Sequence, residues 1–360
     1  MDNQKSRTGN LNLLKSRRFW GLLLTVGLLV YCFYDFDFHS VIKAILAIHF
    51  LYLIPLIFLE AIIAYIRTAR LKYIIDPVKN IRVNDLYPIY CIGMMTNLLM
   101  PYLTGQVARI YLLSKRGQLK KTFLFTTTVL EVLFDGLALI GITLVISLFF
   151  VLPSEFHPWH FFVLAGVLVL ASVLLFWLSR RIGKSSGIFG KLIAKLPQRV
   201  SRRAEEVRSS FLSGLETLRS SKHLLMVSLL SILSWIAQAA LVYILILAFG
   251  FDISVWGAVI ITTVVTIMML IVLSPVNIGT FQAATLAALR PFGIVKSPAL
   301  AFSFLLHIAV YIPPIILGAF FSFKEGLSLK DLRREGEKAV EESGDDDPPG
   351  TSPDQILKTR

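Results

Sequence analysis

Residues 123 to 152 form an almost continuous apolar stretch in which Glu131 and Asp135 are the only charged residues. A stretch of this length can cross a bilayer with some tilt, since about 20 apolar residues suffice. Similar stretches occur at residues 19 to 34, 50 to 66, 159 to 178, 224 to 249 and 297 to 323. The chain is 55% hydrophobic and only 16% charged, whereas soluble domains are about 25% charged. We therefore predict an integral membrane protein with an all-α, polytopic helix bundle.

The polar gaps between these stretches are rich in lysine and arginine, and the whole chain carries a net charge of +13. Cytoplasmic loops of membrane proteins are enriched in these residues. We therefore expect residues 1 to 18, the segment after residue 66 and the segment after residue 323 in the cytoplasm, with both termini on that side. The link between residues 152 and 159 has no lysine or arginine and is expected outside. The basic charge favours an anionic lipid leaflet, rather than nucleic acid, as the partner.

The transmembrane domain is predicted over residues 19 to 323, with a basic cytoplasmic loop at residues 179 to 222. Apolar residues recur in this loop on one helical face: Val200, Ala204, Val207, Phe211, Leu215 and Leu218. Such a helix either lies flat on anionic lipid or packs on the cytoplasmic side of the bundle. Residues 324 to 360 contain few apolar side chains, so we predict a largely disordered cytoplasmic tail.

Two apolar segments are interrupted by a proline followed four residues later by a glycine, with a glutamine close behind. Pro101 and Gly105 interrupt the first, and basic residues flank it on both sides, which favours a re-entrant hairpin over a full crossing. Pro275 and Gly279 interrupt the second, which would enter the membrane from outside. This arrangement is typical of inverted repeats, whose broken helices meet near the bilayer midplane. Kinks that serve only helix packing are the alternative interpretation.

Charged residues within apolar spans suggest a function, because an ionised side chain at the bilayer centre costs about 2.5 to 3.5 kcal/mol on insertion scales. Glu131 and Asp135 lie one helical turn apart and share a face. Arg109, four residues after Gly105, is the cationic candidate for pairing with them. The three residues form either a ligand site or a structural ion pair. An arginine without a protein partner would suit a lipid phosphate.

Other polar residues within the spans could complete a polar interior: Glu60, Gln106, Gln238, Gln282 and His307. His307 alone is typical of a hydrogen-bonded interior histidine, and the glutamines fit interhelical hydrogen bonds as well as ligand contacts. Cys32 and Cys91 both lie in apolar surroundings, so we predict neither a disulfide framework nor a metal site.

The sequence contains no G-x-x-x-x-G-K-[ST], H-E-x-x-H or G-x-S-x-G motif. We therefore expect no catalytic residues, no cofactor and no enzymatic activity. A membrane-embedded lipid-modifying transferase that uses Glu131 and Asp135 as an acid and base pair is one alternative. Another is an accessory subunit that binds a glycosyltransferase through its basic loop.

The residues around both breaks, with the Glu131 to Asp135 stretch, resemble the lysylphosphatidylglycerol synthase transmembrane, or flippase-like, family. The resemblance extends from about residue 20 to residue 323 and also includes Arg67 to Arg70. Some members of this bacterial and archaeal family precede a cytosolic aminoacyl-transferring domain and move aminoacylated phosphatidylglycerol between leaflets. Stand-alone members are similar to proteins of polyprenyl-linked sugar or glycolipid pathways. The present chain lacks the synthase domain, so the resemblance implies lipid translocation in a plasma membrane.

The resemblance implies a head-group site for a phospholipid or a polyprenyl phosphate, formed by the following residues: Arg109, Glu131, Asp135, Asn97, Gln106, Gln282 and His307. Pro101, Gly105, Pro275 and Gly279 match the family's hairpin breaks. The chain departs from the family pattern at three positions where charged residues are frequent: Gln106, Val132 and Gln282.

Overall fold

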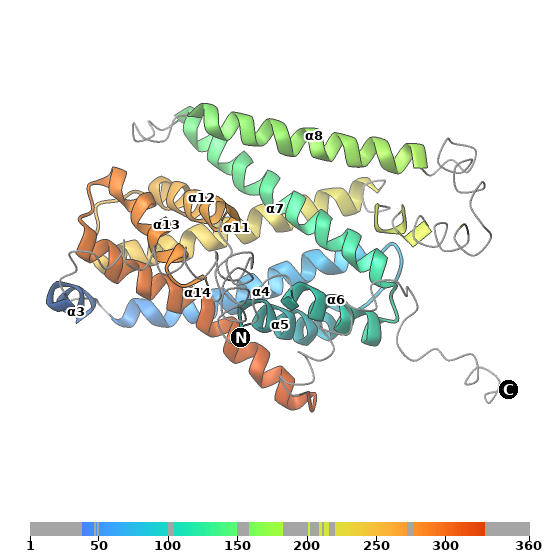
Figure 1. Cartoon of the computed structure of the whole chain (residues 1–360), viewed down its shortest axis with the longest axis horizontal. Helices are drawn as coiled ribbons and strands as arrows, with labels where there is room; N and C mark the ends of the chain where they lie inside the picture. Colours follow the sequence, from blue (N-terminus) through green and yellow to red (C-terminus); the bar gives the residue numbers. More distant parts are fainter. Residues whose placement is uncertain are drawn as a thin grey trace, which may run out of the picture.

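The structure is a computed structural model of the chain, and it describes residues 38–46, 48, 50–99, 104–149, 158–182, 201, 209–210, 212–215, 220–271 and 277–327. Every regular element in these ranges is helical, which confirms the predicted all-α membrane bundle (Figure 1). The predicted first span, the breaks at Pro101 and Pro275, most of the basic loop and nearly all of the tail lie outside the described residues.

The helices follow one another as α3 (Phe38–Leu46), η1 (Phe50–Tyr52), α4 (Leu53–Ile75), α5 (Val83–Leu99), α6 (Thr104–Gly117), α7 (Lys121–Phe149), α8 (Pro158–Ile182), α11 (Ser221–Phe249), α12 (Val255–Ile271), α13 (Thr280–Leu289), η4 (Arg290–Phe292) and α14 (Lys296–Lys324). Within the described part, α7, α11 and α14 are each 29 residues long and apolar enough to cross a membrane. Two shorter apolar segments lie within α8 and α12.

Local sequence signals explain several helix ends. α11 begins after Ser220, whose hydroxyl accepts the backbone N–H of His223 at 3.4 Å. It ends at Gly250, whose φ of +65° is a left-handed conformation that glycine adopts without steric cost. α4 ends at Ile75. Asp76 still has a helical conformation and donates its N–H to the carbonyl oxygen of Lys72, but Pro77 has no backbone N–H with which to continue the helical hydrogen bonds.

Each predicted break separates two helices that pack against each other, α5 with α6 and α12 with α13. α5 has 17 residues and α6 has 14, which correspond to about 25 Å and 21 Å of helix. Both are shorter than the hydrocarbon core of about 30 Å. α12 and α13 lie toward one end of the bundle and α5 and α6 toward the other (Figure 1), as expected for hairpins that enter from opposite faces.

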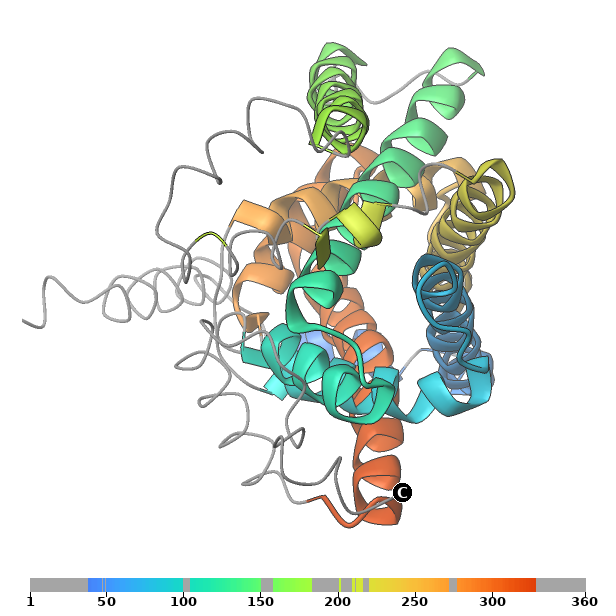
Figure 2. The same ribbon diagram turned by 90° about the vertical axis from the view of Figure 1, so that its right-hand side faces the viewer.

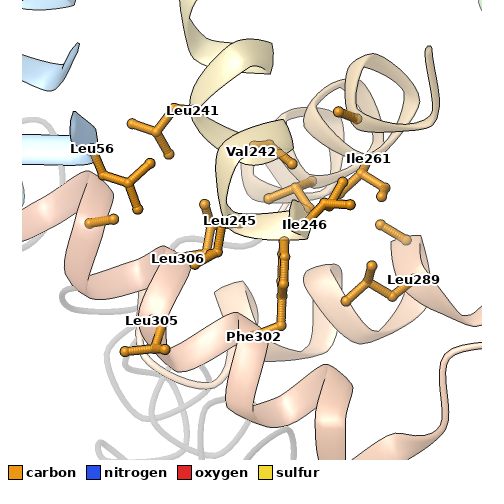
Figure 3. Close-up of a cluster of buried hydrophobic side chains, with 14 of the residues drawn as sticks. Leu56, Leu241, Val242, Leu245, Ile246, Ile261, Leu289, Phe302, Leu305 and Leu306 are labelled. Atoms are coloured by element: carbon orange, nitrogen blue, oxygen red, sulfur yellow. The ribbon is translucent and has the colours of Figure 1, made fainter. Parts of the chain in front are cut away.

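The two hairpins pack into two hydrophobic cores that share α4 and α14. One core lies among α11, α12, α13 and α14, with Leu245, Ile246, Phe302 and Leu306 in contact at its centre (Figure 3). The other surrounds α5 and α6 and includes Leu71 of α4 and Leu124 of α7. α14 contacts both hairpins, so it joins the two halves of the bundle.

α8 lies at the periphery and packs on α7, apart from the rest of the bundle (Figure 2). Its remaining surface exposes large apolar side chains such as Val163, Val167 and Leu174, which is expected of a lipid-facing helix. Within the predicted basic loop, Leu215 is buried against Ile74 and Leu130, so the loop contacts the bundle at this residue. The other apolar residues of its predicted helical face lie outside the described residues, and both expected arrangements of the loop stay predictions.

Candidate functional site

Four charged side chains from three helices meet inside the bundle, and we call them the charged quartet: Arg70 of α4, Arg109 of α6, and Glu131 and Asp135 of α7. Arg109 Nη2 donates to Glu131 Oε2. Arg70 contacts Asp135 through both terminal nitrogens, with Nη2 to Oδ2 at 3.0 Å, and its Nη2 lies 3.8 Å from Glu131 Oε1. Arg70 therefore bridges the two acids of α7.

The quartet is deeply buried. Arg70 is 2% exposed, Glu131 4% and Arg109 6%, while the side chain of Asp135 is 26% exposed. Asp135 is the fifteenth residue of α7, about 21 Å along a helix of about 43 Å. Asp135 and its partners therefore lie well within the span. An unpaired charge at that depth would be costly.

Local backbone features bring the quartet together. Glu131 and Asp135 are four residues apart on α7, so both carboxylates project from one face. The stem of Arg109 passes directly over Gly93 of α5, because a Cβ at Gly93 would lie 2.7 Å from Arg109 Cγ and 2.8 Å from its Cβ. Only a residue without a side chain leaves space for this path.

Neighbouring polar and aromatic groups hold the ions in place. Trp235 Nε1 donates to Asp135 Oδ1 at 3.1 Å, and Arg70 Nη1 donates to the hydroxyl of Ser231 at 3.2 Å. Both partners come from α11. Further hydrogen bonds of this kind strengthen a buried ion pair and fix its geometry.

Arg109 is supported in the same way. Its Nη2 donates to the Thr128 hydroxyl at 3.2 Å, and its guanidinium carbon lies 5.8 Å from the centroid of the Tyr90 ring. An arginine at this distance from an aromatic ring is attracted to the negative face of the ring.

Several buried polar atoms in and beside the quartet have no hydrogen-bond partner in the described part of the protein: Arg70 Nε, Arg109 Nε, Glu131 Oε1 and Gln106 Oε1. Buried polar atoms are satisfied in more than about 90% of cases. This group therefore has capacity for a polar ligand, with donors suited to an anion and acceptors suited to a hydroxyl or amine.

A second polar group lies beside the quartet on α4 and α11. Gln238 Nε2 donates to Glu60 Oε1 at 3.2 Å, and Arg67 Nη2 donates to Gln238 Oε1 at 3.4 Å. A narrow pocket is lined by Glu60 and Arg67 together with Tyr90 of α5. Gln238 is therefore an interhelical hydrogen-bond partner.

Other predicted site residues lie in a separate cluster between α13 and α14. Gln282 Oε1 accepts the N–H of Gly279 at 2.8 Å, which caps α13, while its Nε2 lies 3.1 Å from His307 Nδ1. The imidazole packs between Phe281 and Tyr311, with ring centroids 4.7 Å and 4.2 Å away. These contacts match the predicted interior histidine and give Gln282 a structural role.

The structure thus divides the predicted site into two groups. It brings Arg109 to Glu131, as the sequence suggested, but pairs Asp135 with Arg70 instead. Gln282 and His307 contact each other between α13 and α14, and Asn97 is half-buried near the end of α5. The predicted convergence of the two breaks involves residues outside the described ranges and stays a prediction.

Sequence reasoning did not include Arg67 and Arg70 among the site residues, because they begin the basic segment after residue 66 that was expected in the cytoplasm. On α4, Arg67 follows Glu60 by seven residues and Arg70 follows Arg67 by three. This helical spacing places them along neighbouring parts of one helix surface. That pattern could have indicated a charged stripe within the span.

Among the described residues, no group of three or more His, Cys, Asp and Glu side chains could hold a metal ion. Cys91 is a free, buried thiol.

Residues 18–318 match the family model described as the lysylphosphatidylglycerol synthase TM region. The chain is also similar to a UPF0104 membrane protein of Methanocaldococcus jannaschii, with 21% identity over 295 residues that cover 78% of this chain and 86% of the relative. A UPF0104 membrane protein of Methanothermobacter thermautotrophicus is 25% identical over 242 residues, which cover 63% of this chain and 72% of that protein. The match to the family model spans most of the sequence, and the chain belongs to the lysylphosphatidylglycerol synthase transmembrane family.

Proposed function

We propose that this protein is a lipid translocase that moves a phospholipid or a polyprenyl-phosphate-linked lipid between the leaflets of a plasma membrane. The head group would pass through the polar interior between the hairpins while the hydrocarbon tails stay in the bilayer. The protein itself would act without a cofactor and without changing the lipid chemically.

The charged quartet supports this proposal most directly. It is buried among membrane helices, it contains two arginines, and donors on both guanidiniums lack partners in the described part of the chain. A lipid phosphate would supply the acceptor oxygens that these donors lack, since guanidinium and phosphate form matched hydrogen bonds. Glu131 and Asp135 would balance the charge and release the phosphate.

The choice between a bound ligand and a purely structural ion pair depends on the unsatisfied atoms. A structural pair needs every buried donor and acceptor to be satisfied by the protein. Glu131 Oε1 and the Nε atoms of both arginines have no such hydrogen bond, so a site that also binds a polar group accounts better for this arrangement.

The proposal can be tested by leaflet exchange of fluorescent phosphatidylglycerol in reconstituted liposomes. Arg109→Gln and Glu131→Gln are expected to slow exchange by about tenfold or more, which corresponds to about 1.4 kcal/mol. Arg290→Gln is the matched control, because Arg290 is exposed in the link between α13 and α14. Aminoacylated phosphatidylglycerol and a polyprenyl phosphate serve as parallel substrates.

Absence of exchange by the parent protein with all three lipids would contradict the proposal. Formation of a new lipid product in detergent, where leaflets do not exist, would favour a transferase instead. If both variants exchange lipid as fast as the parent does, the quartet has a structural role and does not bind the head group.

A further inference from the structure

A wide pocket lies at one end of the hairpin formed by α5 and α6. Its volume of about 570 Å³ is within the range of about 300 to 1,000 Å³ that is usual for small-molecule sites. It is lined by the link between α4 and α5, the start of α5, the end of α6, and Glu325, which directly follows α14. None of the residues that line it belongs to the charged quartet, so the pocket is a second, separate candidate site.

Three basic side chains line this pocket. Lys79 and Arg82 come from the link between α4 and α5, and Arg116 comes from the last turn of α6. Arg116 Nη1 pairs with Glu325 Oε2, whereas Lys79 and Arg82 form no ion pair with any described residue. Two cations are therefore available to an anion directly, and Arg116 becomes available when it exchanges its carboxylate partner.

The charges around the pocket favour an anion on balance. Asp85 and Glu325 are the acids that line it, so three positive and two negative charges give the pocket a formal charge of +1. Asp85 lies in the first turn of α5, where the partial positive charge of the helix end offsets part of its negative charge. Replacing Glu325 with glutamine would raise the formal charge to +2.

The buried part of the pocket wall is apolar. Leu86, Ile89 and Leu113 line it, and each is at most 5% exposed. Charged residues beside an apolar wall suit an amphiphile whose polar end is anionic, and basic residues at the cytoplasmic surface attract anionic lipids. The wall therefore favours a lipid head group over a fully polar anion.

Arg116 relates this pocket to the quartet along α6. It follows Arg109 by seven residues, which is two helical turns on the same face, or about 10 Å along the helix axis. The same helix thus carries one arginine at its exposed end and another in the buried quartet.

We propose that this pocket binds a phosphate group, with Lys79, Arg82 and Arg116 as the hydrogen-bond donors. Arg116 exchanges the Glu325 carboxylate for a phosphate oxygen when the ligand binds. The phosphate belongs either to an anionic lipid or to a soluble phosphate compound. Binding itself does not depend on translocation, whereas use of the pocket as the first site for a head group on its way to Arg109 rests on the proposed function.

Calorimetry on the purified full-length protein in an uncharged detergent tests the site. Inorganic phosphate, phosphatidylglycerol and phosphatidylcholine are the three probes, and each is titrated into the parent and into Arg109→Gln. The binding that persists in Arg109→Gln belongs to the pocket, because this variant removes an arginine of the quartet. Phosphatidylglycerol is expected to bind there more tightly than inorganic phosphate, and also more tightly than phosphatidylcholine, whose head group has no net charge.

Substitutions in the pocket should change the affinity in opposite directions. Arg82→Gln and Arg116→Gln are each expected to weaken phosphatidylglycerol binding by about tenfold, the effect of losing one charge-assisted hydrogen bond. Glu325→Gln should tighten binding by about threefold, the scale of a partly exposed ion pair, because it removes a competing carboxylate. A purely structural pair between Arg116 and Glu325 would instead make both of its variants act in the same direction.

Arg290→Gln is the matched control, because Arg290 is an exposed arginine in the link between α13 and α14, and it should bind as the parent does. Weakening in this control equal to that in Arg82→Gln would show a general effect of surface charge and overturn the site. Parental affinity in both Arg82→Gln and Arg116→Gln would also overturn it, and so would weaker binding by Glu325→Gln.

The source of the phosphate and the link to translocation are decided separately. Inorganic phosphate that binds as tightly as phosphatidylglycerol, with the same variant effects, would support the phosphate site with a soluble compound as its ligand. Phosphatidylglycerol binding with these variant effects, in a protein that does not exchange lipid between leaflets, would support the pocket and contradict translocation. The two proposals therefore fail separately.

Discussion

Arg70 lies between two carboxylates of α7, with Asp135 paired to it and Glu131 Oε1 at 3.8 Å. Arg70→Gln would leave Asp135 without a paired cation. Removing one partner of a buried pair costs about 3 to 5 kcal/mol, because the remaining charge stays buried. We therefore expect the thermal unfolding midpoint of Arg70→Gln in detergent to fall well below that of the parent. The double variant Arg70→Gln with Asp135→Asn should recover much of the loss, and equal stability of the single variant and the parent would contradict this role.

Gly93 controls the position of Arg109. In Gly93→Ala the new Cβ would lie 2.7 Å from Arg109 Cγ, closer than van der Waals contact permits, so the arginine must move away from Glu131. We expect lipid exchange to slow about as much as in Arg109→Gln. The control is Gly166→Ala on α8, where no heavy atom lies within 4 Å of the added Cβ. Equal exchange rates for Gly93→Ala and its control would rule out this steric mechanism.

The sequence predicted one ion pair of the quartet and missed the other for a physical reason. Arg109 and Glu131 were found because both interrupt apolar surroundings. Arg70 precedes Lys72 and Lys79, and a basic run at the end of a span usually lies in the cytoplasm. Helix α4 extends to Ile75, so Arg70 is still within the helix and turns inward, which composition alone does not reveal.

At the scale of elements, α14 approaches α5 closely at Gly318. A Cβ there would lie 2.3 Å from Met95 Cβ and 2.7 Å from the Cys91 carbonyl oxygen. Gly318→Ala would therefore push the two helices apart, at a cost of about 1 to 3 kcal/mol for overpacking. We expect a lower unfolding midpoint and faster reaction of the Cys91 thiol with a maleimide, measured in a Cys32→Ser background.

Gly141→Ala on α7 is the matched control for that prediction, since no heavy atom lies within 4 Å of its added Cβ. The thiol of Cys91 should react as slowly in this control as in the parent, because Cys91 is buried. An unchanged reaction rate in Gly318→Ala would mean that the helices tolerate the methyl group without separating.

The sequence allowed the two hairpins to be predicted, but it did not predict which groups their polar side chains would contact. Gly279 ends the second break because it adopts a φ of +85°, a conformation that favours glycine. Gln282 matched a predicted ligand residue, yet its oxygen caps α13 by accepting the Gly279 N–H. The use of a polar side chain within its own helix depends on backbone geometry that residue type does not specify.

At the scale of the whole molecule, two hairpin halves share α4 and α14, and the polar interior lies mainly beside the half formed by α5 and α6. If α5 and α6 enter from the cytoplasm, Glu131 and its partners are nearer to the cytoplasmic end of α7 than to the other end. A head group would then reach the quartet first from the basic side of the membrane, where anionic lipids are attracted.

The orientation that this route requires can be measured with single cysteines. Both native cysteines are first replaced, as Cys32→Ser and Cys91→Ser. Asp252→Cys then probes the link between α11 and α12, and Asn80→Cys probes the link between α4 and α5; both positions are exposed. Because lysine and arginine are concentrated around the link between α4 and α5, we expect that link in the cytoplasm. A membrane-impermeant maleimide should label Asp252→Cys in intact cells and Asn80→Cys only after permeabilisation. The reverse labelling pattern would place the α5 and α6 hairpin outside and would require the head group to enter from the external leaflet.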